Sequence, residues 1–166
     1  MATMDNLQEA FAGESQANRK YLAFAKKADA DGKPGIAKLF RAAAEAETVH
    51  AHAHLRVMGG IGDTAANLQE AIAGEGHEFQ KMYPGFVEEA RQEGNQAALK
   101  SFEFAMAVEE IHHGLYSKAA DALAGGKDFA AEKIYVCPVC GNTEIDGVPD
   151  KCPICGVPGD KFMEIV

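Results

Sequence analysis

The sequence predicts a mainly α protein: a four-helix bundle followed by a small, metal-held domain of short strands and turns. Apolar residues recur every three or four positions over roughly the first 126 residues, for example at Leu22, Ala25, Ile36 and Leu39, which is the period of an amphipathic helix. A nine-residue segment of this part occurs twice. The last thirty residues hold all four cysteines and four of the six prolines and lack a helical period.

Four helices follow from the positions of glycine and proline. Breaks are expected at residues 31–34, 59–62, 93–95 and 125–126, because glycine favours helix ends and proline fits the first helical turn. The third helix contains Pro84, which removes one backbone hydrogen bond and clashes one turn earlier. We therefore expect this helix to kink or split near residues 82–85.

Two domains are predicted, residues 1–130 for the helical bundle and residues 131–166 for the cysteine-containing part. The formal net charge of −9 argues against a nucleic-acid partner, because binding to phosphates needs clustered Lys and Arg. The sequence shows no apolar run of about 18 residues and no signal-peptide pattern at its start. These features predict a cytoplasmic protein that does not enter a membrane.

The first domain contains an internal repeat. The segment NLQEAFAGE at residues 6–14 returns as NLQEAIAGE 61 residues later, and ETVH at residues 47–50 is echoed 62 residues later by EEIH at residues 109–112. Both helices of a hairpin are therefore represented twice. The pattern predicts a bundle made from a duplicated helical hairpin.

The repeat carries a set of carboxylates and imidazoles that suits two metal ions. Each hairpin has an E-x-x-H pair, whose side chains lie on one helix face at positions i and i+3, and each has a single Glu on its first helix. This is the donor pattern of di-iron carboxylate bundles. Glu78 adds a fifth carboxylate, at a position where the first hairpin has Ala17. The predicted catalytic and metal-binding residues are Glu14, Glu47, His50, Glu75, Glu78, Glu109 and His112.

The cysteines form two copies of a C-P-x-C-G knuckle, which place four thiolates around one tetrahedral metal ion. In a chain without a secretory signal, such pairs indicate a metal rather than disulfides. The spacing fits iron and zinc equally, and the neighbouring redox-capable site favours iron, with zinc as the alternative. The predicted ligands are Cys137, Cys140, Cys152 and Cys155.

The chain resembles the rubrerythrin family over nearly its whole length. The resemblance rests on the order of bundle and knuckles, both E-x-x-H pairs, the Glu75-x-x-Glu78 step and the sequence YVCPVCG at residues 135–141. The resemblance implies a ferritin-like diiron bundle with Glu47 and Glu109 as bridges, followed by a rubredoxin-like domain. It also implies three iron ions per chain and exchange of Glu78 for His50 on one iron as the redox state changes. A homodimer is expected, and some members of the family swap helices between subunits.

The resemblance further implies that the protein reduces hydrogen peroxide to water. The four-cysteine iron would pass electrons to the diiron site from a donor such as rubredoxin or an NAD(P)H-dependent reductase. One alternative is a ferroxidase or iron-handling protein that uses O2, although it would have no use for residues 134–166. Another is a regulatory or scaffold protein in which the knuckles hold structural zinc.

Overall fold

The computed structural model describes residues 2–166. The chain divides into two compact units, one ending at Gly62 and the other running from Asp63 to Val166. None of the helices in the described part of the chain is both long and apolar enough to cross a membrane.

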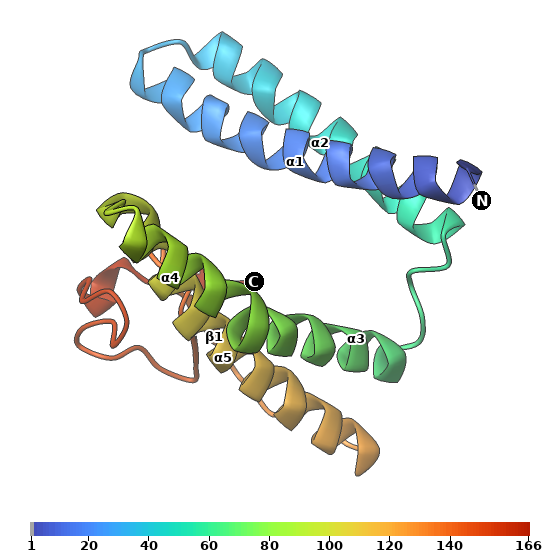
Figure 1. Ribbon diagram of the computed structural model, residues 1–166, viewed down its shortest axis with the longest axis vertical. Coiled ribbons are helices and arrows are strands. Elements are labelled where there is room, and N and C mark those ends of the chain that lie inside the picture. The colour runs from blue at the N-terminus through green and yellow to red at the C-terminus, as the bar shows by residue number, and fades with distance from the viewer. Residues whose placement is uncertain (1) are drawn as a thin grey trace. The chain divides into compact units, whose positions relative to one another are not determined.

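The first unit is a helical hairpin of α1 (Ala2–Ala30) and α2 (Pro34–Val57), which lie side by side (Figure 1). Its interior consists mainly of alanine, because small side chains allow the two helices to approach closely. Asn18 is the one polar side chain among its buried residues. The buried alanines are Ala25, Ala28, Ala37, Ala44 and Ala51.

The second unit begins with a helical hairpin in which one arm is interrupted. α3 (Thr64–His77) leads through a π-helical turn, η1 (Glu78–Met82), into α4 (Tyr83–Gln92), and all three pack against α5 (Gln96–Ala124). The split predicted from Pro84 is confirmed. Pro84 has no N–H, and the Tyr83 N–H bonds to the carbonyl of Glu78, five residues back. Capping by the side chains of Asp63 and Asn95 fixes the starts of α3 and α5.

Residues beyond α5 form a three-stranded antiparallel sheet with the order β2-β1-β3. Its strands are β1 (Ile134–Val136), β2 (Thr143–Ile145) and β3 (Met163–Ile165), and Tyr135 lies opposite Glu144 on one side and Glu164 on the other. A short 3₁₀ turn, Gly159–Lys161, precedes β3. Strands this short bury little apolar surface, so the stability of this module must come largely from its metal.

Replacing Gly159 with Ala should destabilise the cysteine module. A β-carbon at this position would lie 1.9 Å from the carbonyl oxygen of Pro149, so the backbone would have to move. We expect a loss of about 1–3 kcal/mol in the free energy of unfolding, the usual cost of overpacking. Denaturant unfolding of the metal-loaded protein, followed by its metal–thiolate absorption, measures this loss. Gly147→Ala is the matched control, since no atom lies within 4 Å of its β-carbon position; equal stability of the two variants would contradict the prediction.

Candidate metal centres

The two knuckles have the same backbone structure. In the first, Gly141 N–H donates to the Cys137 carbonyl at 3.0 Å and Cys137 N–H donates to the Asn142 carbonyl at 2.8 Å. The second repeats these bonds, from Gly156 N–H to the Cys152 carbonyl at 2.9 Å and from Cys152 N–H to the Val157 carbonyl at 2.8 Å. Gly141 and Gly156 have φ values of 87° and 78°, which only glycine adopts without strain. The repeated C-P-x-C-G sequence therefore builds two equivalent turns.

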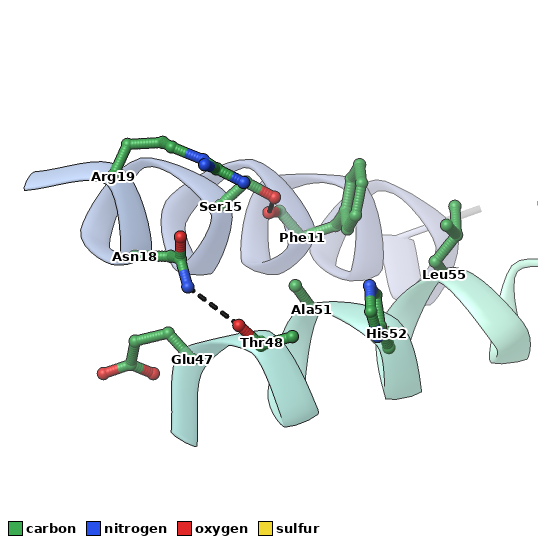
Figure 2. A pocket seen from close by; sticks show the side chains of 9 residues that line it. All are labelled: Phe11, Ser15, Asn18, Arg19, Glu47, Thr48, Ala51, His52 and Leu55. Carbon is green, nitrogen blue, oxygen red and sulfur yellow. Dashed lines mark hydrogen bonds between the residues drawn. The ribbon is translucent and has the colours of Figure 1, made fainter. Parts of the chain in front are cut away.

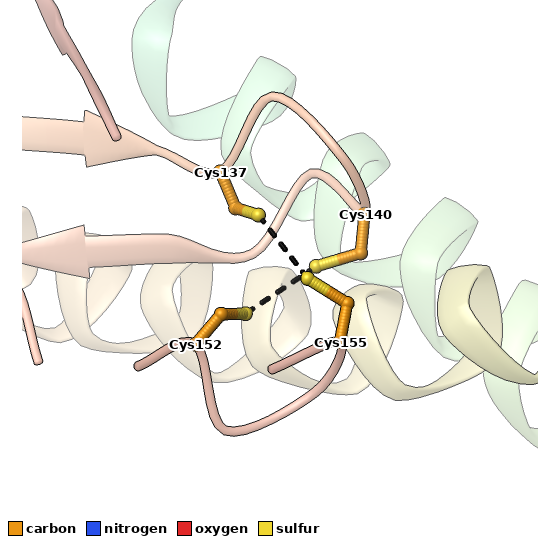
Figure 3. A group of neighbouring side chains, drawn as sticks. All are labelled: Cys137, Cys140, Cys152 and Cys155. Atoms are coloured by element: carbon orange, nitrogen blue, oxygen red, sulfur yellow. Dashed lines mark hydrogen bonds between the residues drawn. The ribbon is translucent and has the colours of Figure 1, made fainter. Parts of the chain in front are cut away.

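Four sulfur atoms converge from these turns on one point (Figure 3). The Sγ atoms of Cys137 and Cys155 are 3.5 Å apart, and those of Cys140 and Cys152 are 3.6 Å apart. A tetrahedral ion with metal–sulfur bonds of about 2.3 Å requires sulfur–sulfur distances of about 3.8 Å. The arrangement fits a single iron or zinc ion with only slight expansion.

Backbone N–H groups favour the thiolate forms in this site. Although burial raises the pKa of Cys152, hydrogen bonds from the N–H groups of Cys155 and Ile154 lower it to about 7. Burial raises the pKa of Cys140, although a hydrogen bond from the Asn142 N–H acts to lower it. A cation bound here would stabilise all four thiolates, because it compensates charges that burial disfavours.

The first hairpin brings together Glu14 from α1 and the pair Glu47 and His50 from α2, with one donor atom of each within 4.8 Å of the others. His50 Nδ1 lies 3.1 Å from Glu47 Oε2 and 3.9 Å from Glu14 Oε2. A hydrogen bond between the two carboxyl groups raises the pKa of Glu14 and lowers that of Glu47. This hydrogen bond favours the protonated form of Glu14 and the ionised form of Glu47, and a bound metal ion would offset the repulsion between the two carboxylates.

Glu75, Glu109 and His112 form the equivalent group in the second hairpin, again within 4.8 Å of one another. His112 Nδ1 lies 2.8 Å from Glu109 Oε2 and 3.9 Å from Glu75 Oε1. Burial, followed by the negative charge of Glu109, raises the pKa of Glu75. Each hairpin thus offers two carboxylates and one imidazole, the oxygen-rich donor set that suits iron or manganese.

Glu78 stands at the start of the π-helical turn and is half-buried. Tyr83 follows that turn, and burial together with the charges of Glu78, Glu109 and Glu75 raises the pKa of its phenol. Its hydroxyl therefore keeps its proton at neutral pH and remains a hydrogen-bond donor beside these acids. π-Turns often occur at functional sites, and this one carries the carboxylate that the first hairpin lacks.

A cavity of about 210 Å³ adjoins Glu47 in the first hairpin. Figure 2 shows the Asn18 side chain reaching from α1 to Thr48 on α2, where its amide donates to Thr48 Oγ1 at 2.8 Å and to the Ala44 carbonyl at 2.7 Å. These bonds join the two helices one turn after Glu14 and directly beside Glu47. They fix the separation of the two carboxylate-bearing segments.

Thr143 is a neighbour of His112 that no sequence pattern indicated. Its Oγ1 lies 3.0 Å from His112 Nε2, on the side of the ring opposite the carboxylates. The two residues are 31 positions apart, and a lone Thr after a knuckle carries no metal-binding signature. The contact depends on how the cysteine module packs on α5, which local spacing cannot predict.

Comparison with known proteins gives two family matches. Residues 5–120 match the family model described as Rubrerythrin, and residues 135–163 match the one described as Rubrerythrin, rubredoxin-like domain. The chain is 38% identical to Rubrerythrin-2 of Clostridium acetobutylicum, over 97% of this chain and 95% of that protein. It is 34% identical to Rubrerythrin of Nitratidesulfovibrio vulgaris, over 96% of this chain and 92% of the relative.

Solved structures give the same result. The partially reduced state of nigerythrin matches with a TM-score of 0.59 and 32% identity, covering 98% of this chain and 86% of nigerythrin. The fully reduced, all-ferrous state of nigerythrin matches with the same score and coverage. These similarities confirm the predicted fold class, a mainly α ferritin-like protein with a small rubredoxin-like module.

Proposed function

Because the chain belongs to the rubrerythrin family, we propose that it reduces hydrogen peroxide to water with electrons relayed through its rubredoxin-like module. The observation that carries this proposal is the presence, in one chain, of two carboxylate–imidazole donor groups and a tetrahedral set of four sulfurs. The first kind of site suits a pair of iron ions, and the second suits a one-electron iron centre.

The bundle of residues 1–130 is the proposed catalytic domain. Its two donor groups, together with Glu78, would supply the ligands of one iron pair, and Glu47 and Glu109 would bridge it. When bound, such a pair supplies two electrons and the Lewis acidity that cleavage of an O–O bond requires. The protein itself orients the ligands and keeps a proton on Tyr83 beside the acids.

Residues 131–166 are the proposed electron-entry domain. Each hydrogen peroxide molecule consumes two electrons and two protons to give two water molecules, so the diiron pair must be reduced again after every turnover. A rubredoxin or an NAD(P)H-dependent reductase is the proposed external donor, and the proposed setting is a cytoplasmic homodimer. Zinc at the four cysteines would remove this relay.

The proposal is tested by reducing the iron-loaded protein fully under anaerobic conditions and mixing it rapidly with hydrogen peroxide or O2. Return of the ferric thiolate absorption should be at least about tenfold faster with peroxide. The matched control is Glu109→Ala, which should slow the return with peroxide while leaving the absorption spectrum unchanged. Faster return with O2 would favour a ferroxidase, and a colourless, zinc-loaded protein would favour a structural module.

A further inference from the structure

One hydroxyl group connects a ligand of the bundle to the cysteine module. Thr143 begins β2 and is half-buried, and its Oγ1 lies 3.0 Å from His112 Nε2 and 3.2 Å from the carbonyl oxygen of Gly141. Gly141 directly follows Cys140 in the first knuckle. Val108, one turn before His112 on α5, is buried and lies 3.7 Å from the β-carbon position of Gly141. The contact is therefore part of the packed surface where the module meets α5.

One arrangement of protons satisfies all of these contacts once a cation occupies the site. Thr143 has a single hydroxyl proton, which it donates to the Gly141 carbonyl. Its oxygen is then free to accept from His112 Nε2–H. A cation that replaces the proton between Nδ1 and the carboxylates leaves Nδ1 as a lone-pair donor, and this atom faces Glu109 at 2.8 Å and Glu75 at 3.9 Å.

We propose that Thr143 is a positioning residue for His112. It holds the imidazole in the tautomer that presents Nδ1 to the metal, and it fixes the rotation of the ring about the Cβ–Cγ bond. It does so from the knuckle that holds the other metal, because Gly141 orients the Thr143 hydroxyl. Outer hydrogen bonds of this kind commonly set the orientation and basicity of a ligating histidine.

Within the first unit, the repeat offers His50 no counterpart of this restraint. His50 occupies the equivalent position in the first hairpin, but within residues 2–62 its ring meets only carboxylates, those of Glu47 and Glu14. Its side chain is 56% exposed, against 27% for His112. Of the two E-x-x-H pairs, the second therefore holds the imidazole of His112 by an additional hydrogen bond, and the first leaves that of His50 more exposed. Resting on the proposed function, the inference concerns only how His112 is held.

The test compares Thr143→Val, which keeps the shape but removes the hydroxyl, with Thr143→Ser, which keeps the hydroxyl. Metal affinity of the bundle is measured on the full chain by competition between Fe(II) and a chelator. Thr143→Val should bind the bundle metal about 10- to 100-fold more weakly, the usual effect of removing a partner of a ligating histidine. Thr143→Ser should restore affinity to within about threefold of the original protein.

A second readout follows the ring proton itself in the full chain loaded with zinc, a diamagnetic probe. Nitrogen NMR of the original protein should show His112 with a slowly exchanging Nε2–H and a metal-bound Nδ1, and Thr143→Val should make that proton exchange rapidly. Ser117→Ala is the matched control, because Ser117 lies on the same helix as His112 and its hydroxyl donates to the His113 carbonyl, not to an imidazole.

The outcomes separate a positioning role from a structural one. Unchanged affinity and unchanged Nε2–H exchange in Thr143→Val would overturn the proposal, as would a loss of affinity that Thr143→Ser fails to restore, since packing would then be the cause. Neither readout uses peroxide. Failure of the proposed peroxide reduction would therefore leave this result intact, and the reverse also holds.

Discussion

Chains carrying Glu109→Ala are expected to keep the cysteine-bound iron and to lose nearly all of the metal of the carboxylate–imidazole site. Glu109 Oε2 lies 2.8 Å from His112 Nδ1, and the same carboxylate interacts with Glu75. Its proposed place is a bridge, so one substitution removes a ligand from both ions. Metal analysis together with the ferric thiolate absorption measures the two kinds of site separately.

Loss of metal in this variant should not come from unfolding. Because the charge of Glu109 helps to raise the pKa of Glu75, its removal relieves a repulsion, and the metal-free variant should melt at the same temperature as the original or higher. The matched control is Glu110→Ala, the neighbouring exposed acid on α5, which should leave metal content unchanged. Full metal occupancy in Glu109→Ala would refute the bridging role.

Local spacing explains why most of this site could be predicted from the sequence. Residues three apart on a helix face the same way, so E-x-x-H placed His112 Nδ1 near Glu109 and His50 Nδ1 near Glu47 before any tertiary contact was known. The knuckles are equally local, since each is closed by hydrogen bonds within six residues. Pro84 likewise predicted the interruption of its helix.

Other features depend on choices that local sequence leaves open. A proline inside a helix can be accommodated by a kink or by a π-turn, and only the packing of α3 and α4 against α5 selects the π-turn at Glu78. Strands of three residues are too short to show a period of two. The contact of Thr143 with His112 needs the module docked on its helix. Contacts between segments that are distant in the sequence could therefore not be predicted from local patterns.

Replacing Cys152 with Ser should have the reverse of the effect expected for Glu109→Ala: loss of the cysteine-bound iron and retention of the metal in the carboxylate–imidazole site. Cys152 is 2% exposed, and its sulfur receives two backbone N–H bonds that favour a thiolate. Serine cannot replace a thiolate ligand, and structural metal binding contributes roughly 10–16 kcal/mol to the folding of small zinc domains. The ferric thiolate absorption should therefore disappear and the module should unfold, while the bundle keeps its metal under saturating conditions.

The Cys152→Ser variant also connects the two proposals through Thr143. If the folded knuckle is what places Thr143 against His112, unfolding of the module should weaken metal binding by the bundle to the same extent as Thr143→Val, and the double variant should be no weaker. Val139→Ser is the matched control, because Val139 lies in the first knuckle, next to Cys140, but is 58% exposed. Persisting thiolate absorption in Cys152→Ser would refute the ligand assignment. Full bundle affinity in a variant whose module has unfolded would show that His112 is held by the helices alone.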